Sequence, residues 1–188
     1  MQALAPSNEK SSSQEEPSLD ADGFEALFRE CAGDVHGYLI SLLRDRSAAE
    51  DVTALAFERL YRSRARLDRR RGSPRAWLFA IARNAALDEL RQRRRASGYQ
   101  ADAGRATEPP AGDEAFEQAE RRMVVATALA TLPLRERELV LLKFHGQLTN
   151  AELAHTLGIS ESNVGTRLHR ALTHMREQYA PTEEDQVA

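Results

Sequence analysis

The chain has 188 residues, enough for one domain of ordinary size or two small ones, and 41% of them are hydrophobic, so it can bury cores. Its net charge of −3 is unevenly spread: residues 59–95 hold 13 arginines against three acids, a local charge of +10, which is typical of a nucleic-acid surface. Its single cysteine excludes an intramolecular disulfide or a cysteine-built zinc site, and no apolar run approaches the roughly 20 residues of a membrane span, so a cytoplasmic protein is expected.

The first part of the chain predicts a tail and two helices. Residues 1–20 are serine-rich and acidic, which predicts a disordered tail. Apolar residues from Phe24 to Leu43 follow helical spacing, and Cys31 lies on that stripe, where a buried, inert thiol is favoured over a redox sensor. Ser47 and Glu50 have the spacing of a capping box, which predicts a second helix over residues 48–63. Its acidic first turn suits helix capping or a protein partner equally well.

An arginine-rich loop and a basic helix follow. Residues 64–72 are too charged to bury and predict a loop, whereas Ser73 and Pro74 mark a helix start, with the helix running to residue 95. Trp77 has the spacing of a core residue, and base stacking is the alternative role. Polar side chains along another side of this helix, together with the loop, could follow one strand of phosphates; a merely solvated face is the alternative.

Residues 96–118 separate two domains. Glycines, two prolines and a net charge of −4 predict a flexible, extended acidic linker between a domain of residues 21–95 and one of residues 119–179. In the second domain, apolar spacing predicts one helix ending near Pro133 and another over residues 134–144, and an acidic tail occupies residues 180–188. The expected fold class is all-α, with two small helical domains joined by a flexible linker.

Residues 149–177 carry the most informative pattern. Thr149 and Glu152 match a capping box, Gly158 lies where a chain leaving a helix often needs positive φ, and Ser160 is a strong N-cap for a second helix. This is the pattern of a helix-turn-helix, whose second helix enters the major groove; an αα-hairpin in a bundle is the alternative. The DNA-facing candidates on the outer face of that helix are Ser162, Asn163, Thr166, Arg167 and Arg170.

These stretches resemble the extracytoplasmic-function (ECF) group of bacterial RNA polymerase sigma factors. AEDVTALAFERLYR at residues 49–62 is similar to the segment that binds the polymerase clamp, and PRAWLFAIARNAALDELRQRRR at residues 74–95 to the helix that engages the minus-ten element. Residues 132–172 resemble domain four, which binds the minus-thirty-five element. The resemblance implies a subunit that binds core RNA polymerase, directs it to promoter DNA, assists promoter melting and is held by an anti-sigma factor, without membrane insertion.

The resemblance also implies roles for individual residues. Ala54 and Leu55 stand where the family usually has glutamine and an acid, so the polymerase contact falls on Asp51 and Glu58. Gly165 stands where many members have a basic residue, and glycine there would allow close approach of the backbone to DNA. The implied minus-ten residues are Arg64, Arg66, Arg69, Arg70, Arg71, Trp77, Arg83, Asn84, Asp88 and Arg91.

Two other classes of protein were weighed. Residues 149–177 hold three acids and three arginines, so this unit is neutral and should bind DNA weakly alone. That favours a factor held on DNA by a larger enzyme over a stand-alone helix-turn-helix transcription regulator. An enzyme is not expected, because the five histidines show no metal-ligand spacing and no nucleophile motif or phosphate loop appears; neither a metal nor a cofactor is predicted.

Overall fold

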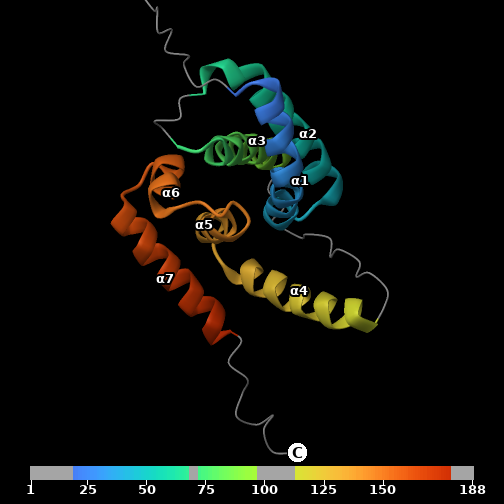
Figure 1. Cartoon of the computed structure of the whole chain (residues 1–188). Coiled ribbons are helices and arrows are strands. Elements are labelled where there is room, and N and C mark those ends of the chain that lie inside the picture. Colours follow the sequence, from blue (N-terminus) through green and yellow to red (C-terminus); the bar gives the residue numbers. More distant parts are fainter. Residues whose placement is uncertain (1–18, 68–71, 97–112, 179–188) are drawn as a thin grey trace, which may run out of the picture.

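The structure is a computed structural model that describes residues 19–67, 72–96 and 113–178, with side chains from residue 121 onward in its fourth helix. The first domain packs α1 (Ala21–Leu43), α2 (Arg46–Ser63) and α3 (Pro74–Ala96), with a 3-10 turn, η1 (Arg64–Arg66), after α2. The second consists of α4 (Asp113–Thr131), α5 (Leu134–Phe144), α6 (Asn150–Leu157) and α7 (Glu161–Glu177) (Figure 1). The predicted all-α fold with two helical domains is confirmed.

The first domain is a three-helix unit with a dense apolar core. Cys31, Val35 and Leu39 of α1 are fully buried, as are Leu60 of α2 and Phe79 of α3. Burying a side chain of this size contributes about 1.5–3 kcal/mol. The prediction that Cys31 is buried is confirmed, and burial raises the pKa of its thiol although Arg75 acts against this rise.

One predicted helix start in the first domain was wrong. Asp45, not Ser47, caps α2: its carboxylate accepts a hydrogen bond from the backbone N–H of Ala48 at 3.1 Å, and the helix begins at Arg46. Leu19, assigned to the tail, is only 4% exposed, and its N–H donates to the Arg64 carbonyl at 3.3 Å. The next residue, Asp20, caps α1. Residues 1–18 of the predicted tail lie outside the described residues.

The second domain follows the predicted helix-turn-helix closely and departs from the prediction at its first helix. Thr149 and Glu152 form the capping box, and Gly158 ends α6 with φ +67°. Ser160 then caps α7 by accepting from the Asn163 N–H at 3.3 Å. By contrast, α4 begins at Asp113, so the last six residues of the predicted linker are helical. Residues 97–112 and 179–188, which hold the rest of the linker and the acidic tail, lie outside the described residues.

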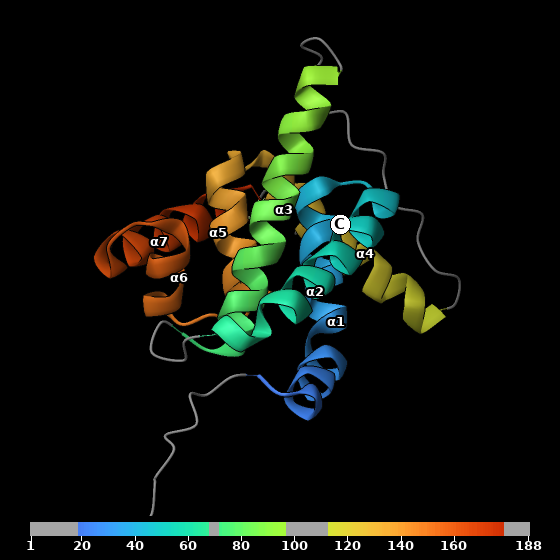
Figure 2. The ribbon, with the colours of Figure 1, turned by 90° about the horizontal axis from the view of Figure 1, so that it is seen from above.

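The two domains are in contact, which no motif in the sequence predicted. In Figure 2, α5 to α7 lie on one side of α3 and α2 on the other, and the C-terminal turns of α3 project beyond its neighbours. Helix α1 contacts both α3 and α5. Buried residues of both domains form one continuous apolar core, which includes Leu78 and Ala82 of α3 and Leu139 and Leu142 of α5. The face of α3 that meets the second domain is therefore covered.

Candidate nucleic-acid interface

Helix α7, the second helix of the helix-turn-helix, presents a polar face to solvent. Val164, Leu168 and Ala171 are buried against the rest of the second domain. The candidates Ser162, Thr166 and Arg170 are exposed, whereas Asn163 and Arg167 are half-buried. All five lie within the first ten residues of the helix, the part that reaches base edges when such a helix enters a major groove.

Gly165 lies on this same helix in open surroundings. No heavy atom outside the helix backbone and the neighbouring residues would lie within 4 Å of a Cβ added there. Its half-burial therefore does not reflect tight packing against another element. A small residue at this place leaves room for a DNA backbone or base edge to approach the helix.

The proposed minus-ten residues on α3 are divided between two sides of the helix. Trp77, Asn84, Asp88 and Arg91 follow one another at seven, four and three residues, which places them on one stripe of an α-helix. Asn84, Asp88 and Arg91 are exposed, and Arg91 donates to Asp88 at 2.8 Å. Arg83 lies about a third of a turn away from that stripe. The structure therefore brings together four of the five predicted side chains on this helix and separates the fifth.

Arg83 faces the second domain. Its Nε lies 2.8 Å from Oε1 of Glu138 in α5, and the side chain of Glu138 is only 5% exposed. Burial raises the pKa of Glu138 above its ordinary value, while the neighbouring Arg83 and the more distant Arg135 act in the opposite direction. Arg83 is thus paired with a carboxylate of the second domain of the same chain.

The arginine-rich loop is described only in part. Arg64 donates to the Tyr61 carbonyl at 2.7 Å and its guanidinium lies 3.8 Å from the centre of the Tyr61 ring, so it is held against α2. Arg66 is exposed. The candidates Arg69, Arg70 and Arg71 lie outside the described residues.

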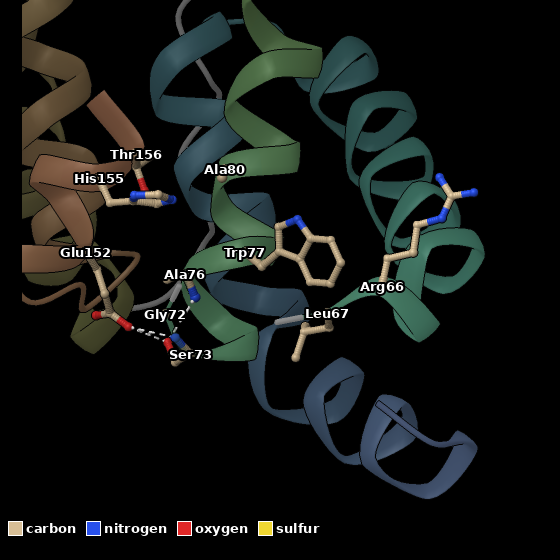
Figure 3. Close-up of a pocket in the computed structure, with 10 residues that line it drawn as sticks. All are labelled: Arg66, Leu67, Gly72, Ser73, Ala76, Trp77, Ala80, Glu152, His155 and Thr156. Atoms are coloured by element: carbon tan, nitrogen blue, oxygen red, sulfur yellow. Dashed lines mark hydrogen bonds between the residues drawn. The ribbon is translucent and has the colours of Figure 1, made fainter. Parts of the chain in front are cut away.

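Trp77 lies at a pocket between α3 and α6. The pocket has a volume of about 420 Å³, and Figure 3 shows Trp77 and Arg66 on the side of the first domain, with Glu152, His155 and Thr156 on the side of the second. Trp77 is half-buried and also packs against the apolar core. Its indole therefore combines the core role that its spacing predicted with a face toward this pocket.

The candidate polymerase-binding face of α2 is exposed. Asp51 and Glu58 lie two turns apart with the half-buried Leu55 between them on the same side, and Glu58 pairs with Arg62 at 2.7 Å. Beside this face lies an aromatic cluster that the sequence reading missed. It consists of Phe24, Phe28, Phe57 and Tyr61, with ring centres 4.7 to 6.4 Å apart in edge-to-face contacts.

Two of these aromatic residues, Phe28 and Tyr61, are each 46% exposed. The signal for the cluster was present, because Phe24 and Phe28 on one helix and Phe57 and Tyr61 on the next each stand four residues apart. Exposed aromatic side chains beside a charged face are common in protein interfaces.

Two polar side chains of the first domain, Arg75 and Ser73, join it to the second domain, a role that the sequence did not predict. Arg75 of α3 donates to the carbonyls of His145 at 2.9 Å and Gly146 at 2.7 Å, and it also pairs with Asp34 of α1. Ser73 donates from its hydroxyl to Glu152 of α6 at 2.5 Å (Figure 3). Because the partners stand 70 to 79 residues apart in the chain, no local motif could have revealed these contacts.

Burial and hydrogen bonding shift the pKa values of two groups at this contact. Burial lowers the pKa of His145 below its ordinary value of 6.5, with Asp34 acting in the opposite direction. Burial alone would raise the pKa of Glu152, but hydrogen bonds from Ser73 and Thr149 outweigh it and the pKa is lowered. We call the arrangement in which α3 contacts α5 and α6 the closed arrangement. In it, the lowered pKa values favour the neutral form of His145 and the ionised form of Glu152.

Two other kinds of site are absent from residues 19–67, 72–96 and 113–178, with side chains described from residue 121 onward in α4. No helix in these ranges has both the length and the apolar character needed to cross a bilayer. No group of three or more His, Cys, Asp or Glu side chains in the same ranges is placed to hold a metal ion.

Comparison with protein families gives two matches. Residues 27–96 match the model for Sigma-70 region 2, and residues 122–175 match that for Sigma-70, region 4. The first segment covers nearly all of α1 to α3, and the second runs from the described part of α4 almost to the end of α7. The proposed minus-ten and minus-thirty-five residues thus fall within different family segments.

Individual relatives agree with this division. The chain is 30% identical over 158 residues to the ECF RNA polymerase sigma factor RpoE of Cereibacter sphaeroides, covering 84% of this chain and 87% of the relative. It is 30% identical over 151 residues to the ECF RNA polymerase sigma factor SigL of Mycobacterium tuberculosis, covering 80% and 85%.

A solved structure has the same fold. The sigma factor RpoE in complex with the anti-sigma factor NepR from Bartonella quintana superposes with a TM-score of 0.67 at 20% sequence identity. The match covers 82% of this chain and 94% of that one.

Proposed function

The chain belongs to the ECF RNA polymerase sigma factors, proteins that direct transcription, and from this membership we propose how it selects promoters: α7 reads a minus-thirty-five element and α3 a minus-ten element. The observation that carries the proposal is the exposed polar face of α7, which stands on a buried apolar stripe and begins at a capped N-terminus. A helix presented in this way has the width and the side chains to enter a major groove.

In the proposed minus-thirty-five contact, the five candidates on α7 divide their roles. Arg167 and Arg170 suit guanine edges or phosphates, Asn163 suits adenine, and Ser162 and Thr166 suit either a base or a phosphate. Because residues 149–177 have no net charge, the electrostatic part of this contact is weak. The affinity for promoters would then come largely from the polymerase that carries the sigma factor.

In the proposed minus-ten contact, the stripe of Trp77, Asn84, Asp88 and Arg91 meets the non-template strand. Unstacking one base costs a few kcal/mol, which stacking on an aromatic ring and hydrogen bonds to the base edge can offset. Trp77 offers an aromatic ring on the first domain, and the exposed Arg66 lies on the same side of the pocket as that ring (Figure 3). Capture of an unstacked base here would assist promoter melting.

Core RNA polymerase is the proposed partner of the exposed face of α2. Asp51, Leu55 and Glu58 present two carboxylates around an apolar side chain, and Phe28 and Tyr61 extend the surface with exposed rings. We also infer an anti-sigma partner, because the similar RpoE was solved in complex with an anti-sigma factor.

Run-off transcription tests the proposal. The full chain is mixed with core RNA polymerase and genomic promoter fragments, and discrete transcripts are expected where core enzyme alone gives none. A variant with Asp51→Lys and Glu58→Lys should lose most of these transcripts, whereas Glu50→Lys, an equally exposed change on the same helix, should retain them. Promoter-specific DNA binding without any polymerase-dependent transcript would instead indicate a stand-alone regulator.

A further inference from the structure

The pocket between α3 and α6 has a floor of small side chains. Ala76 and Ala80 stand about one turn apart on α3. In Figure 3 they have Trp77 on one side and His155 and Thr156 on the other. Because a methyl group fills little space, the larger side chains around the two alanines enclose a hollow of about 420 Å³. That volume lies within the range of about 300–1,000 Å³ that is usual for small-molecule sites.

The first-domain wall of the pocket is apolar and partly aromatic. The indole of Trp77 is half-buried, and Leu67, which lines the same wall, is only 5% exposed. An aromatic side chain offers a face on which another ring can stack. Stacking is tolerant of the identity of that ring, because every flat ring system has a π-face. This wall therefore suits a ligand that carries a flat ring.

The charge that the pocket offers to a ligand is positive. Glu152 is an acid of the lining, but both of its carboxylate oxygens are engaged. Oε1 accepts from the backbone N–H of Ser73 at 3.2 Å and from its hydroxyl at 2.5 Å, and Oε2 accepts from the N–H and the hydroxyl of Thr149, each at 2.9 Å. Arg66, by contrast, is exposed, and a guanidinium has five N–H donors that suit a phosphate or a carboxylate. An anionic ligand is therefore favoured over a cationic one.

The second-domain wall of the pocket supplies hydrogen-bonding groups. His155 is exposed and Thr156 is half-buried, and both belong to α6. An imidazole and a hydroxyl can each donate or accept a hydrogen bond. A ring that stacks on Trp77 would meet these groups at its far edge. Such a ligand would contact both domains at once.

We propose that this pocket binds a small organic anion with a flat ring, of the size and kind of a nucleoside monophosphate. The ring stacks on Trp77, the anionic group pairs with Arg66, and His155 and Thr156 hydrogen-bond to the far edge of the ring. The ligand is a free molecule in solution and the second domain takes part in holding it. The proposal therefore does not rest on the contact of α3 with the minus-ten element.

Fluorescence of Trp77 tests the proposal directly, because this residue is the only tryptophan in the chain. The probes are adenosine monophosphate and uridine monophosphate, titrated into the full-length free protein with excitation at wavelengths that the bases do not absorb. Saturable quenching is expected below millimolar concentration, and isothermal titration calorimetry should give the same Kd. Absence of saturable binding of both probes by both methods would overturn the proposal.

Fragments of the probes show which of their parts the pocket recognises. Adenosine and uridine lack the anion and inorganic phosphate lacks the ring, so each should bind at least about tenfold more weakly than the intact monophosphate. If a nucleoside binds as tightly as its monophosphate, the assigned role of Arg66 is wrong. If inorganic phosphate binds as tightly, the assigned role of Trp77 is wrong.

Substitutions place the ligand in the pocket. Arg66→Gln should weaken binding about ten- to hundredfold, because a charge-assisted hydrogen bond is lost. Arg94→Gln is the matched control, since it removes the same charge from an exposed position on α3 about 25 Å from Trp77. His155→Ala should weaken binding about two- to tenfold, whereas His174→Ala, at an exposed position on α7, should not.

The same variants can overturn the assignment. All four replaced side chains are exposed, and circular dichroism checks that each variant is folded. Equal affinities of Arg66→Gln and Arg94→Gln would show that the anion binds elsewhere, and an unchanged affinity of His155→Ala would show that the second domain takes no part. A single-stranded oligonucleotide that binds more tightly than the monophosphates and is insensitive to His155→Ala would assign the pocket to DNA instead. Run-off transcription tests the proposed function separately, since it needs polymerase and duplex DNA, which are absent here.

Discussion

Arg83 shows how strongly the role of one side chain depends on its surroundings. On sequence alone it belongs with Asn84, Asp88 and Arg91, and in the structure it turns toward Glu138 in the second domain. A carboxylate with a raised pKa is a costly buried charge, and Arg83 offsets part of that cost. In this arrangement the Arg83 guanidinium is paired with Glu138 and is not available to another partner.

Arg167→Ala distinguishes base reading from phosphate contact on α7. If Arg167 reads a base, the loss should be about 1–3 kcal/mol of binding and should relax preference at one position of the minus-thirty-five element. Arg176→Ala removes the same charge nine residues further along, about 13 Å from this site, and should have little effect. Competition binding of holoenzyme with a randomised element measures both, and an equal loss across all sequences would assign Arg167 to a phosphate.

Gly165→Ala separates stability from DNA binding. Alanine is favoured over glycine inside a helix by about 1 kcal/mol, and the added Cβ meets no neighbour, so the midpoint of thermal unfolding should rise. If DNA approaches the backbone at this point, the same methyl group should weaken holoenzyme binding to the minus-thirty-five element. A more stable variant with unaltered promoter affinity would show that the open space at Gly165 is not used by DNA.

At the scale of the elements, capping side chains determine where the helices begin. Asp45→Ala should lower the free energy of unfolding by about 1 kcal/mol, because the carboxylate of Asp45 satisfies the Ala48 N–H at the start of α2. Ser47→Ala, at the cap that the sequence reading preferred, should cost much less. Chemical denaturation of both variants measures the difference, and equal losses would count against Asp45 as the cap.

Local signals accounted for most elements of this fold and for few of its contacts. The helix-turn-helix was predictable because each of its capping residues interacts with backbone groups only a few positions away in the chain. These residues are Thr149, Glu152, Gly158 and Ser160. The cap of α2 was misassigned because Asp45 and Ser47 both suit an N-cap and only the packed structure selects one. The start of α4 was placed late because an acidic, glycine-containing sequence favoured a linker.

The candidate site likewise has a part that could be predicted from the sequence and a part that could not. The outer face of α7 could be read from helical periodicity, since one helix brings its own residues together. The pairing of Arg83 with Glu138 depends on how the two domains pack together. Because the two residues are 55 positions apart in the chain, helical periodicity could not predict that they meet. The same holds for Arg75 and the turn at His145 and Gly146.

At the scale of the whole molecule, the closed arrangement should weaken in mild acid. The charged or titratable groups facing His145 are Asp34 on α1 and Arg75 on α3. Because the closed form lowers the pKa of His145, its contribution to closure is complete above the ordinary value of 6.5. That contribution is lost as pH falls through the lowered pKa. Glu138, whose pKa is raised in the closed form, acts oppositely at lower pH, where its protonation favours closure.

Acrylamide quenching of Trp77 emission should therefore increase between pH 7.5 and about 5.5 in the wild type. His145→Asn should flatten that profile, whereas His174→Asn, which removes an exposed histidine on α7, should leave it as in the wild type. Identical profiles for the wild type and His145→Asn would exclude this histidine as the titrating group.

Gly37 and Arg75, which contact the turn between α5 and α6, lie in the half of the protein that is synthesised first. Translation at about 5–20 residues per second needs roughly 4–16 s to add the approximately 80 residues between the end of α3 and the end of α7. Until then the ribosome holds a folded three-helix unit whose α3 has no cover. Each newly made polypeptide therefore passes through a brief stage in which the face of α3 that later contacts α5 and α6 is exposed.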